Sequence, residues 1–146
     1  MLLSCQHQSV EPLTDDELRL WHAWKRASER VRARVAETIA AETGLSDPDF
    51  AILTRVEDAA DGALRQNELA ASLGWHRSRL SHQLTRMQER GLVTRVAAGT
   101  GVEVRATSAG REVIARARPH HAAAVREHLI AHATPEFLVT LERLAR

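Results

Sequence analysis

Residues 76–90 combine an apolar stripe with a set of side chains that donate hydrogen bonds. If this segment is a helix, Leu80, Leu84 and Met87 share its inner face, because residues three and four apart lie on one side. Its outward face, flanks and first turn then carry Arg77, Ser78, Arg79, Ser81, His82, Thr85, Arg86 and Glu89. Such side chains donate to phosphates and base edges, and arginine can bind guanine through two hydrogen bonds. The pattern favours a helix that binds nucleic acid; the alternative is a structural helix with a polar face.

The charge of the chain differs by region. Twenty basic residues oppose nineteen acidic ones, so the formal net charge is only +1. Between Arg65 and Arg111, however, eight arginines oppose three glutamates, a local charge of +5, which leaves −4 for the remainder. A basic centre within an acidic frame is typical of a local phosphate-binding surface. A solvated arginine-rich face would have the same charges, so both interpretations stay open at this point.

Two helices and two strands are predicted to position these side chains. A short helix over 65–74 ends at a glycine, and the helix at 76–90 follows it. Short helix, glycine turn and second helix form the helix-turn-helix arrangement. Two β-rich runs, 92–96 and 102–106, then flank a glycine-containing turn at 97–101. They predict a β-hairpin, or wing, that can lie against the adjacent nucleic-acid backbone.

A long amphipathic helix precedes this unit. Thr14 and Glu17 form a capping box, and apolar side chains then recur at three- and four-residue steps until Gly44, a helix-ending glycine. A stripe of this length needs more partner surface than a small domain offers, which indicates an oligomer interface. Ser46 is the predicted cap of a second helix, which ends at 61–62.

Two helices are predicted after the wing. The first, capped by Thr107 or Ser108, continues to about residue 133 and is kinked or interrupted by Pro119, which lacks an amide hydrogen. The second begins at 134–135 and is apolar on one side. The predicted fold class is therefore mainly α with a small β-hairpin, a winged helix-turn-helix flanked by N- and C-terminal helices.

The segment 66–95 resembles the winged helix of the MarR family. The resemblance is carried by ELAASLGWHRSRLSHQL at 68–84 and by RGLVTR at 90–95. The order of elements is similar too, with a long first helix, a winged helix in the middle and a long helix after TSAG at 107–110. The resemblance covers roughly 14–146, and its outer helices match in layout more than in motif.

The resemblance implies a two-fold homodimer formed by the N- and C-terminal helices. It also implies a regulator of transcription, usually a repressor, that binds a palindromic operator in double-stranded DNA. Members of the family are often released from DNA by a small aromatic or phenolic ligand. The chain then divides into a flexible tail (1–13), dimerisation helices (14–45 and 107–146) and a winged helix-turn-helix DNA-binding region (46–106).

The predicted wing departs from the family pattern at its tip. Family wings usually carry an Asp-x-Arg motif whose arginine enters the minor groove, whereas the tip at 97–101 is shorter and uncharged. Arg95 or Arg105 would then only contact phosphate or pair with Glu103. We therefore expect a lower affinity for DNA, or a different sequence preference, than a full wing gives. The residues expected to contact DNA are Gln66, His76, Arg77, Ser78, Arg79, Ser81, His82, Thr85, Arg86, Arg95, Thr100 and Arg105.

In the family, effectors bind between the dimerisation helices and the winged helix. The residues expected to line such a pocket are Trp21, His22, Trp24, Arg26, Phe50 and Arg55. Trp21 and Trp24 also belong to the apolar stripe of the first helix, which favours a place in the core or in the dimer interface. His22 and Arg26 are equally consistent with solvated side chains.

The sequence lacks the motifs that other functional classes require. The sequence contains no phosphate-cradling glycine loop, nucleophile elbow or metal-hydrolase motif, so we expect no enzyme, no catalytic residue and no cofactor. It contains no run of about 18 apolar residues, so we expect no membrane span and a cytoplasmic protein. With Cys5 as its one cysteine, the chain has no internal disulfide and no cysteine-built zinc site.

Three alternatives remain as variants of the same fold. Cys5 raises the possibility of a redox switch. In the peroxide-sensing members of the family the reactive cysteine is held by tyrosines, and this chain contains no tyrosine. His128 and His132 share a helix face near His120 and His121, but a closed zinc site needs about four ligands in tetrahedral geometry. Solvated histidines, and no metal site, are therefore favoured. A winged-helix adaptor for protein partners would show apolar anchors on the outward face of 76–90, where this chain is polar.

Overall fold

The computed structural model describes residues 11–146. Cys5 and most of the segment expected as a tail, 1–13, therefore lie outside the described residues. The elements follow in the order α1 (Asp15–Thr43), α2 (Asp47–Asp58), β1 (Ala63–Arg65), α3 (Gln66–Leu73), α4 (Arg77–Glu89), β2 (Val93–Ala98), β3 (Gly101–Ala106), α5 (Ser108–His128), the 3-10 turn η1 (Ile130–His132) and α6 (Pro135–Leu144). None of the helices between residues 11 and 146 combines the length and apolarity needed to cross a membrane.

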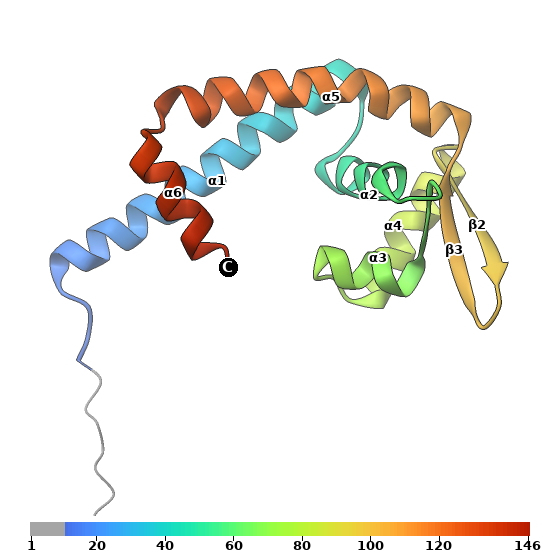
Figure 1. Ribbon diagram of the computed structural model, residues 1–146, viewed down its shortest axis with the longest axis horizontal. Coiled ribbons are helices and arrows are strands. Elements are labelled where there is room, and N and C mark those ends of the chain that lie inside the picture. Colours follow the sequence, from blue (N-terminus) through green and yellow to red (C-terminus); the bar gives the residue numbers. More distant parts are fainter. Residues whose placement is uncertain (1–10) are drawn as a thin grey trace, which may run out of the picture.

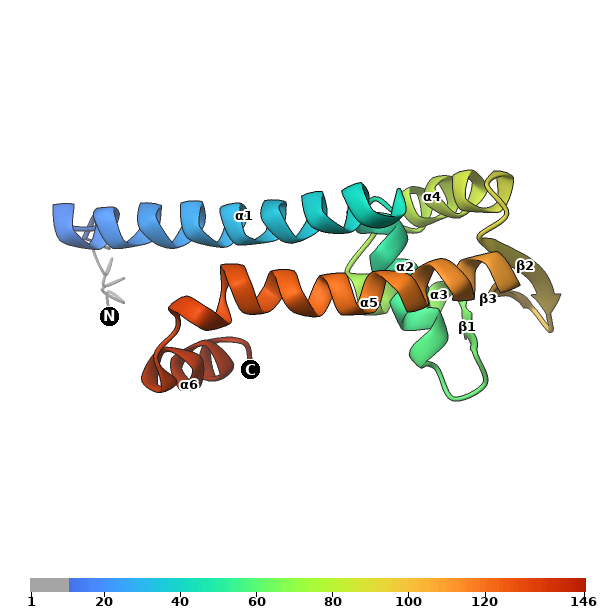
Figure 2. The ribbon, with the colours of Figure 1, turned by 90° about the horizontal axis from the view of Figure 1, so that it is seen from above.

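The two long helices, α1 and α5, run along the length of the molecule. α1 and α5 pack side by side and run in opposite directions (Figures 1 and 2). The short helices α2, α3 and α4 and the β-hairpin gather at the end where α1 finishes and α5 begins, and α6 lies at the other end (Figure 1). The predicted fold class, mainly helical with a small winged sheet, is confirmed.

Local side-chain caps explain where the first two helices begin. The Thr14 amide donates to Glu17 Oε2 at 2.8 Å while the Thr14 hydroxyl accepts from the Glu17 amide, so the predicted capping box is present. Ser46 and Asp49 form the same arrangement at the start of α2. Gly44 ends α1 with φ of 73°, a left-handed conformation that favours glycine. α2 ends at Asp58, before the predicted boundary at 61–62.

The wing belongs to a three-stranded sheet rather than to an isolated hairpin. Strands β2 and β3 pair antiparallel across a tight turn, with Ala98 opposite Gly101. β1, which the sequence analysis did not predict, pairs with the other edge of β3, so the strand order is β1-β3-β2. The third strand ties the segment before α3 to the base of the wing.

One core joins the winged helix to the two long helices. It is built from α1, α2, α3, α4, β2, β3 and α5, and its fully buried members include Ile52, Leu53, Leu69, Leu80, Leu84, Met87 and Val104. The start of α5 lies very close to the chain that leaves α4. A Cβ on Gly110 would lie 2.1 Å from the Leu92 carbonyl oxygen, so this contact requires glycine. The contact fixes α5 directly against the winged helix.

The course of α5 differs from the prediction. Its N-cap is Thr107, one of the two predicted caps, whose hydroxyl accepts from the Gly110 amide at 3.0 Å. The helix runs through Pro119 without interruption, and it ends at His128 rather than near residue 133. Ala115, whose carbonyl loses its donor four residues before the proline, is exposed, so water can replace the missing amide. The break falls instead at Leu129, where φ is −124° and ψ is −62°.

The end of the helical layer away from the winged helix lacks a partner within residues 11–146 (Figure 1). Ile39 is the one buried residue of α1, and α6 buries none. Trp21 and Trp24 are 50% and 41% exposed, so of the two places expected for them, the core and the dimer interface, the core of the single chain is excluded. Other exposed apolar side chains in these helices are Leu18, Leu20, Phe137, Val139 and Leu144. A large apolar surface is thus left open.

Candidate nucleic-acid interface

Helix α4 separates its side chains sharply by polarity. Leu80, Leu84 and Met87 are fully buried, as the periodicity predicts. The opposite side presents exposed Ser78, His82, Thr85 and Arg86, while Ser81 on the flank is half-buried. Core packing therefore fixes the rotation of the helix and turns its hydrogen-bond donors toward solvent.

The start of α4 offers a second kind of donor. His76 is the N-cap, and its side chain makes no capping hydrogen bond, so the first-turn amides have no side-chain acceptor. The helix dipole adds partial positive charge at this end, and exposed Arg77 adds a full one. Amides and charge together suit a phosphate group.

Arg79 is held in place by an aromatic ring. Its guanidinium lies 4.0 Å from the centroid of the Trp75 ring, and Trp75 packs against the core. Stacking on an aromatic face leaves the edge of the guanidinium available for hydrogen bonds. The turn between α3 and α4 thus positions an arginine beside the outward face of α4.

Arg95 connects the wing to α4. From strand β2 its Nε donates to Gln88 Oε1 and its Nη2 donates to Thr85 Oγ1, both at 3.0 Å. These bonds hold the positive charge of Arg95 against the outward side of α4 instead of at the wing tip. Sequence reasoning placed Arg95 on the wing but had no signal for its two partners on the helix.

The wing carries two further arginine contacts. Arg105 pairs with Glu103, with 2.7 Å between Nη2 and Oε1, which is one of the two roles the sequence left open. Arg65, which was not among the predicted site residues, donates from Nη1 to the Ala98 carbonyl oxygen at 3.1 Å. A hollow of about 230 Å³ lies between Gln66 at the start of α3 and Thr100 at the wing turn. Arg65 closes over this turn.

A buried carboxylate lies behind α4. Asp49 is fully buried, and Gln83 of α4 donates to its Oδ1 at 2.7 Å. Arg90 donates to Asp49 Oδ2, also at 2.7 Å, and the Ser46 amide donates to the same oxygen at 3.0 Å. Burial raises the pKa of Asp49, but the hydrogen bonds from Arg90 and Ser46 outweigh it and hold that pKa below its ordinary value. This cluster has no local sequence signature, because Gln83 and Arg90 lie 34 and 41 residues from Asp49 along the chain.

The six residues expected to bind an effector are not brought together. His22 and Arg26 line an open hollow on α1, whereas Trp24 lines a separate apolar groove toward α6. The other three make separate contacts: Lys25 lies over Trp21, Phe50 of α2 stacks on His121 of α5 at 4.8 Å, and Arg55 is bonded to its own helix at Ala51. Within residues 11–146 no three His, Cys, Asp or Glu side chains gather as a metal site would require.

Comparison with known proteins bears on this geometry. A model of the MarR family matches residues 43–101, which span α2, α3, α4 and the wing up to its turn. AbsC, a MarR family transcriptional regulator from Streptomyces coelicolor, is 29% identical with a TM-score of 0.88, and 94% of each chain is covered. Residues 43–101 therefore form a winged helix of the MarR family type, and the chain as a whole is similar to this regulator. Family members are transcriptional regulators rather than enzymes.

Two other MarR family structures contain DNA. Sco3205, a MarR family transcriptional regulator from Streptomyces coelicolor in complex with DNA, is 27% identical with a TM-score of 0.88, covering 94% of this chain and 88% of its own. A mutant MarR from E. coli, complexed with operator DNA, shares the fold at 19% identity and a TM-score of 0.77, covering 92% and 96%. No curated protein sequence matches the chain.

Proposed function

We propose that this protein is a sequence-specific regulator of the MarR family that binds double-stranded DNA through α4, as a homodimer on a palindromic operator, and represses transcription. The observation that carries the proposal is the polarity of α4, whose apolar face is fully buried while its exposed face is made of donors. Such a face suits base edges in the major groove. It offers an adaptor no apolar anchor, since the large exposed apolar side chains described lie on other elements.

Several further residues support DNA as the partner. Arg77 and the uncapped amides suit a phosphate at the start of α4, and Arg79 on Trp75 lies beside its outward face. Arg95 brings a further charge from the wing. In this proposal residues 46–106 form the DNA-binding region and the terminal helices, 14–45 and 107–146, form the dimer. The uncharged turn at Gly99 and Thr100 leaves the wing with phosphate contacts rather than minor-groove readout.

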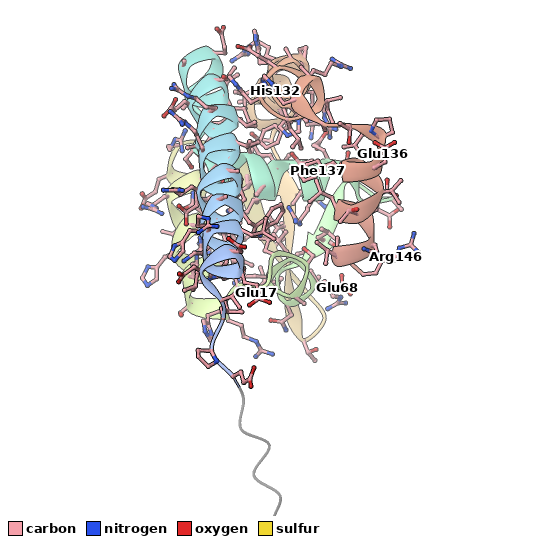
Figure 3. The ribbon with its side chains drawn as sticks, turned by 90° about the vertical axis from the view of Figure 1, so that its left-hand side faces the viewer. Glu17, Glu68, His132, Glu136, Phe137 and Arg146 are labelled. Atoms are coloured by element: carbon pink, nitrogen blue, oxygen red, sulfur yellow. The ribbon has the colours of Figure 1, made fainter. Side chains whose placement is uncertain are left out.

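The open apolar surface supports the homodimer. α6 and the first half of α1 expose large apolar side chains at opposite walls of a groove of about 430 Å³. Figure 3 shows Phe137 on the side of α6 that faces α1, where it lines this groove with Trp24. Exposed apolar patches of this kind mark interfaces. A second copy that contributes the same helices would cover the patch by two-fold symmetry.

Selection of duplexes from a random pool tests the DNA site. A two-fold dimer places its two α4 helices on half-sites one turn of DNA apart, or a small multiple, so the enriched sequence should be a palindrome. Enrichment of an unpaired half-site would contradict the dimer, and no enrichment would contradict specific binding.

Variants of two arginines test whether α4 supplies the sequence-specific contacts and the wing supplies the phosphate contacts. Arg79→Ala should lower discrimination between the selected duplex and a scrambled one by roughly tenfold, because it removes a base contact. Arg95→Ala should weaken both duplexes alike and flatten the salt dependence by about one phosphate contact. Arg116→Ala, at an exposed position of α5 outside the predicted DNA-binding residues, serves as the matched control. Equal behaviour of the first two variants would refute this division.

Release by a small aromatic ligand is the remaining part of the proposal. Its support is the similarity to the MarR family together with the aromatic side chains Trp24 and Phe137 in one groove. Benzoate is a suitable probe, because it combines an aromatic ring with an anion. Loss of DNA binding on its addition, at constant ionic strength, would support an effector site; unchanged binding across a series of aromatic acids and phenols would contradict one.

A further inference from the structure

One buried amide connects the protein core with the outward face of α4. Gln83 is 5% exposed, and it and Asp49 are the two buried polar residues between residues 11 and 146. Gln83 Nε2 donates to Asp49 Oδ1 at 2.7 Å. On its other side, Gln83 Oε1 accepts a hydrogen bond from Arg86 Nη2. Arg86 is exposed among the donors of α4, so the amide links a core carboxylate to a surface guanidinium.

The chemistry of the two neighbours fixes the orientation of this amide. An ionised carboxylate only accepts hydrogen bonds, so it must face the NH₂ group of Gln83. A guanidinium only donates, so it must face the carbonyl oxygen. Rotating the amide by half a turn would place acceptor against acceptor and donor against donor. The orientation therefore follows from the charges of Asp49 and Arg86.

Asp49 is itself held from the junction of α1 and α2. The Ser46 amide and Arg90 donate to its Oδ2, and Arg90 also donates to the Gly44 carbonyl oxygen at 3.3 Å. These donors keep the carboxyl ionised, because they offset the cost of burying its charge. A fixed anion at this point gives Gln83 a rigid support.

We propose that Gln83 is a positioning residue for specificity, which holds the Arg86 guanidinium in one orientation for contact with a base pair. The inference rests on the proposed function, since it assumes that the outward face of α4 meets DNA. An unrestrained arginine loses much rotamer freedom when it binds. An arginine that is already held in its binding orientation loses less conformational entropy on binding. Its contact with the correct base pair therefore contributes more to the affinity. No sequence pattern indicates this role, because Gln83 occupies an inward position between Leu80 and Leu84.

A double-mutant cycle tests whether Gln83 acts through Arg86. The readout is the ratio of affinities for the selected and scrambled duplexes, measured by fluorescence anisotropy and corrected for the active fraction of each preparation. Gln83→Met should lower this ratio by roughly tenfold, within the range of one good base contact. In the Arg86→Ala background the same change should have no further effect. A merely structural glutamine would lower the ratio equally in both backgrounds or in neither, and either result overturns the proposal.

Gln88→Met is the matched control on the same helix. Gln88 bonds to Arg95 rather than to Arg86, so its effect should be independent of the Arg86→Ala change. Coupling of Gln88→Met to Arg86 as strong as that of Gln83→Met would contradict a specific link.

A measurement on the unaltered protein does not depend on folding of the variants. In the DNA-free protein, ¹⁵N relaxation of the arginine Nε groups should show Arg86 more rigid than Arg77, which is also exposed on α4. Equal mobility of the two side chains would overturn the proposal. If the unaltered protein fails to discriminate between duplexes, the proposed function fails, whereas a mobile Arg86 in a discriminating protein refutes only the role of Gln83.

Discussion

Replacing Arg90 with methionine removes a guanidinium from a buried carboxylate while keeping much of the aliphatic side chain. Arg90 Nη1 donates to Asp49 Oδ2 at 2.7 Å, and Nη2 donates to the Gly44 carbonyl oxygen at 3.3 Å. A hydrogen bond to a charged group contributes about 1.5–3 kcal/mol. Because the Arg90 side chain is 46% exposed, solvent screens the pair, and we expect Arg90→Met to lower the free energy of unfolding by about 2 kcal/mol.

Urea denaturation followed by circular dichroism measures this loss. It should be done at pH 7 and at one protein concentration, since dimerisation would make stability depend on concentration. Arg34→Met is the matched control: it breaks an exposed pair with Glu37 at 3.2 Å and should cost less than about 0.5 kcal/mol. Equal losses in the two variants would refute the account of Asp49 as a buried anion stabilised by Arg90.

The same pair predicts a dependence on pH. Asp49 has a lower pKa in the folded protein than in the unfolded chain, so it binds fewer protons when folded. Its stabilising contribution is therefore present above the unfolded pKa of about 3.9 and is lost as the pH falls through the folded value. The difference between Arg90→Met and the unaltered protein should shrink when the pH is lowered from 5 toward 3. A constant difference over this window would contradict the argument.

Three further predictions concern the frame, the stacked arginine and the dimer. Gly110→Ala should cost about 1–3 kcal/mol in urea denaturation, because its Cβ would lie 2.1 Å from the Leu92 carbonyl oxygen; unchanged stability would show that α5 is not fixed there. Trp75→Leu should lower discrimination between duplexes about two- to fivefold through loss of the stack on Arg79, and Trp75→Phe should restore part of it; an unchanged ratio in Trp75→Leu contradicts this role. In sedimentation experiments Phe137→Asp should convert the dimer to a monomer, whereas the control Glu142→Gln should leave the mass unchanged. A Phe137→Asp protein that still sediments as a dimer would exclude this face as the interface.

The parts of the fold that could be predicted are those set by local rules. The Thr14–Glu17 capping box and the left-handed Gly44 follow from residues a few positions apart. The spacing of Leu80, Leu84 and Met87 alone determines which side of α4 is buried. This rotation also exposes most of the polar residues expected at the interface, because the opposite side of the helix must then face solvent.

The parts that could not be predicted depend on contacts between distant segments. Strand β1 has only three residues, too few for an alternating pattern, and it is defined by its pairing with β3. Gln83 is a polar residue on the buried side of α4, and its partner lies 34 residues earlier. The apolar stripe that includes Trp21 and Trp24 is present on α1. The pattern of a stripe, however, does not indicate whether it packs against the same chain or against another.

The most direct test of the account is a fluorescence anisotropy titration of the selected duplex and its scrambled counterpart over a series of salt concentrations. A sequence-specific regulator should bind the selected duplex at least about a thousandfold more tightly, and its affinity should fall steeply as salt rises, since several phosphates are neutralised. Weak and equal binding to both duplexes at every salt concentration would contradict the claim that the exposed face of α4 reads DNA.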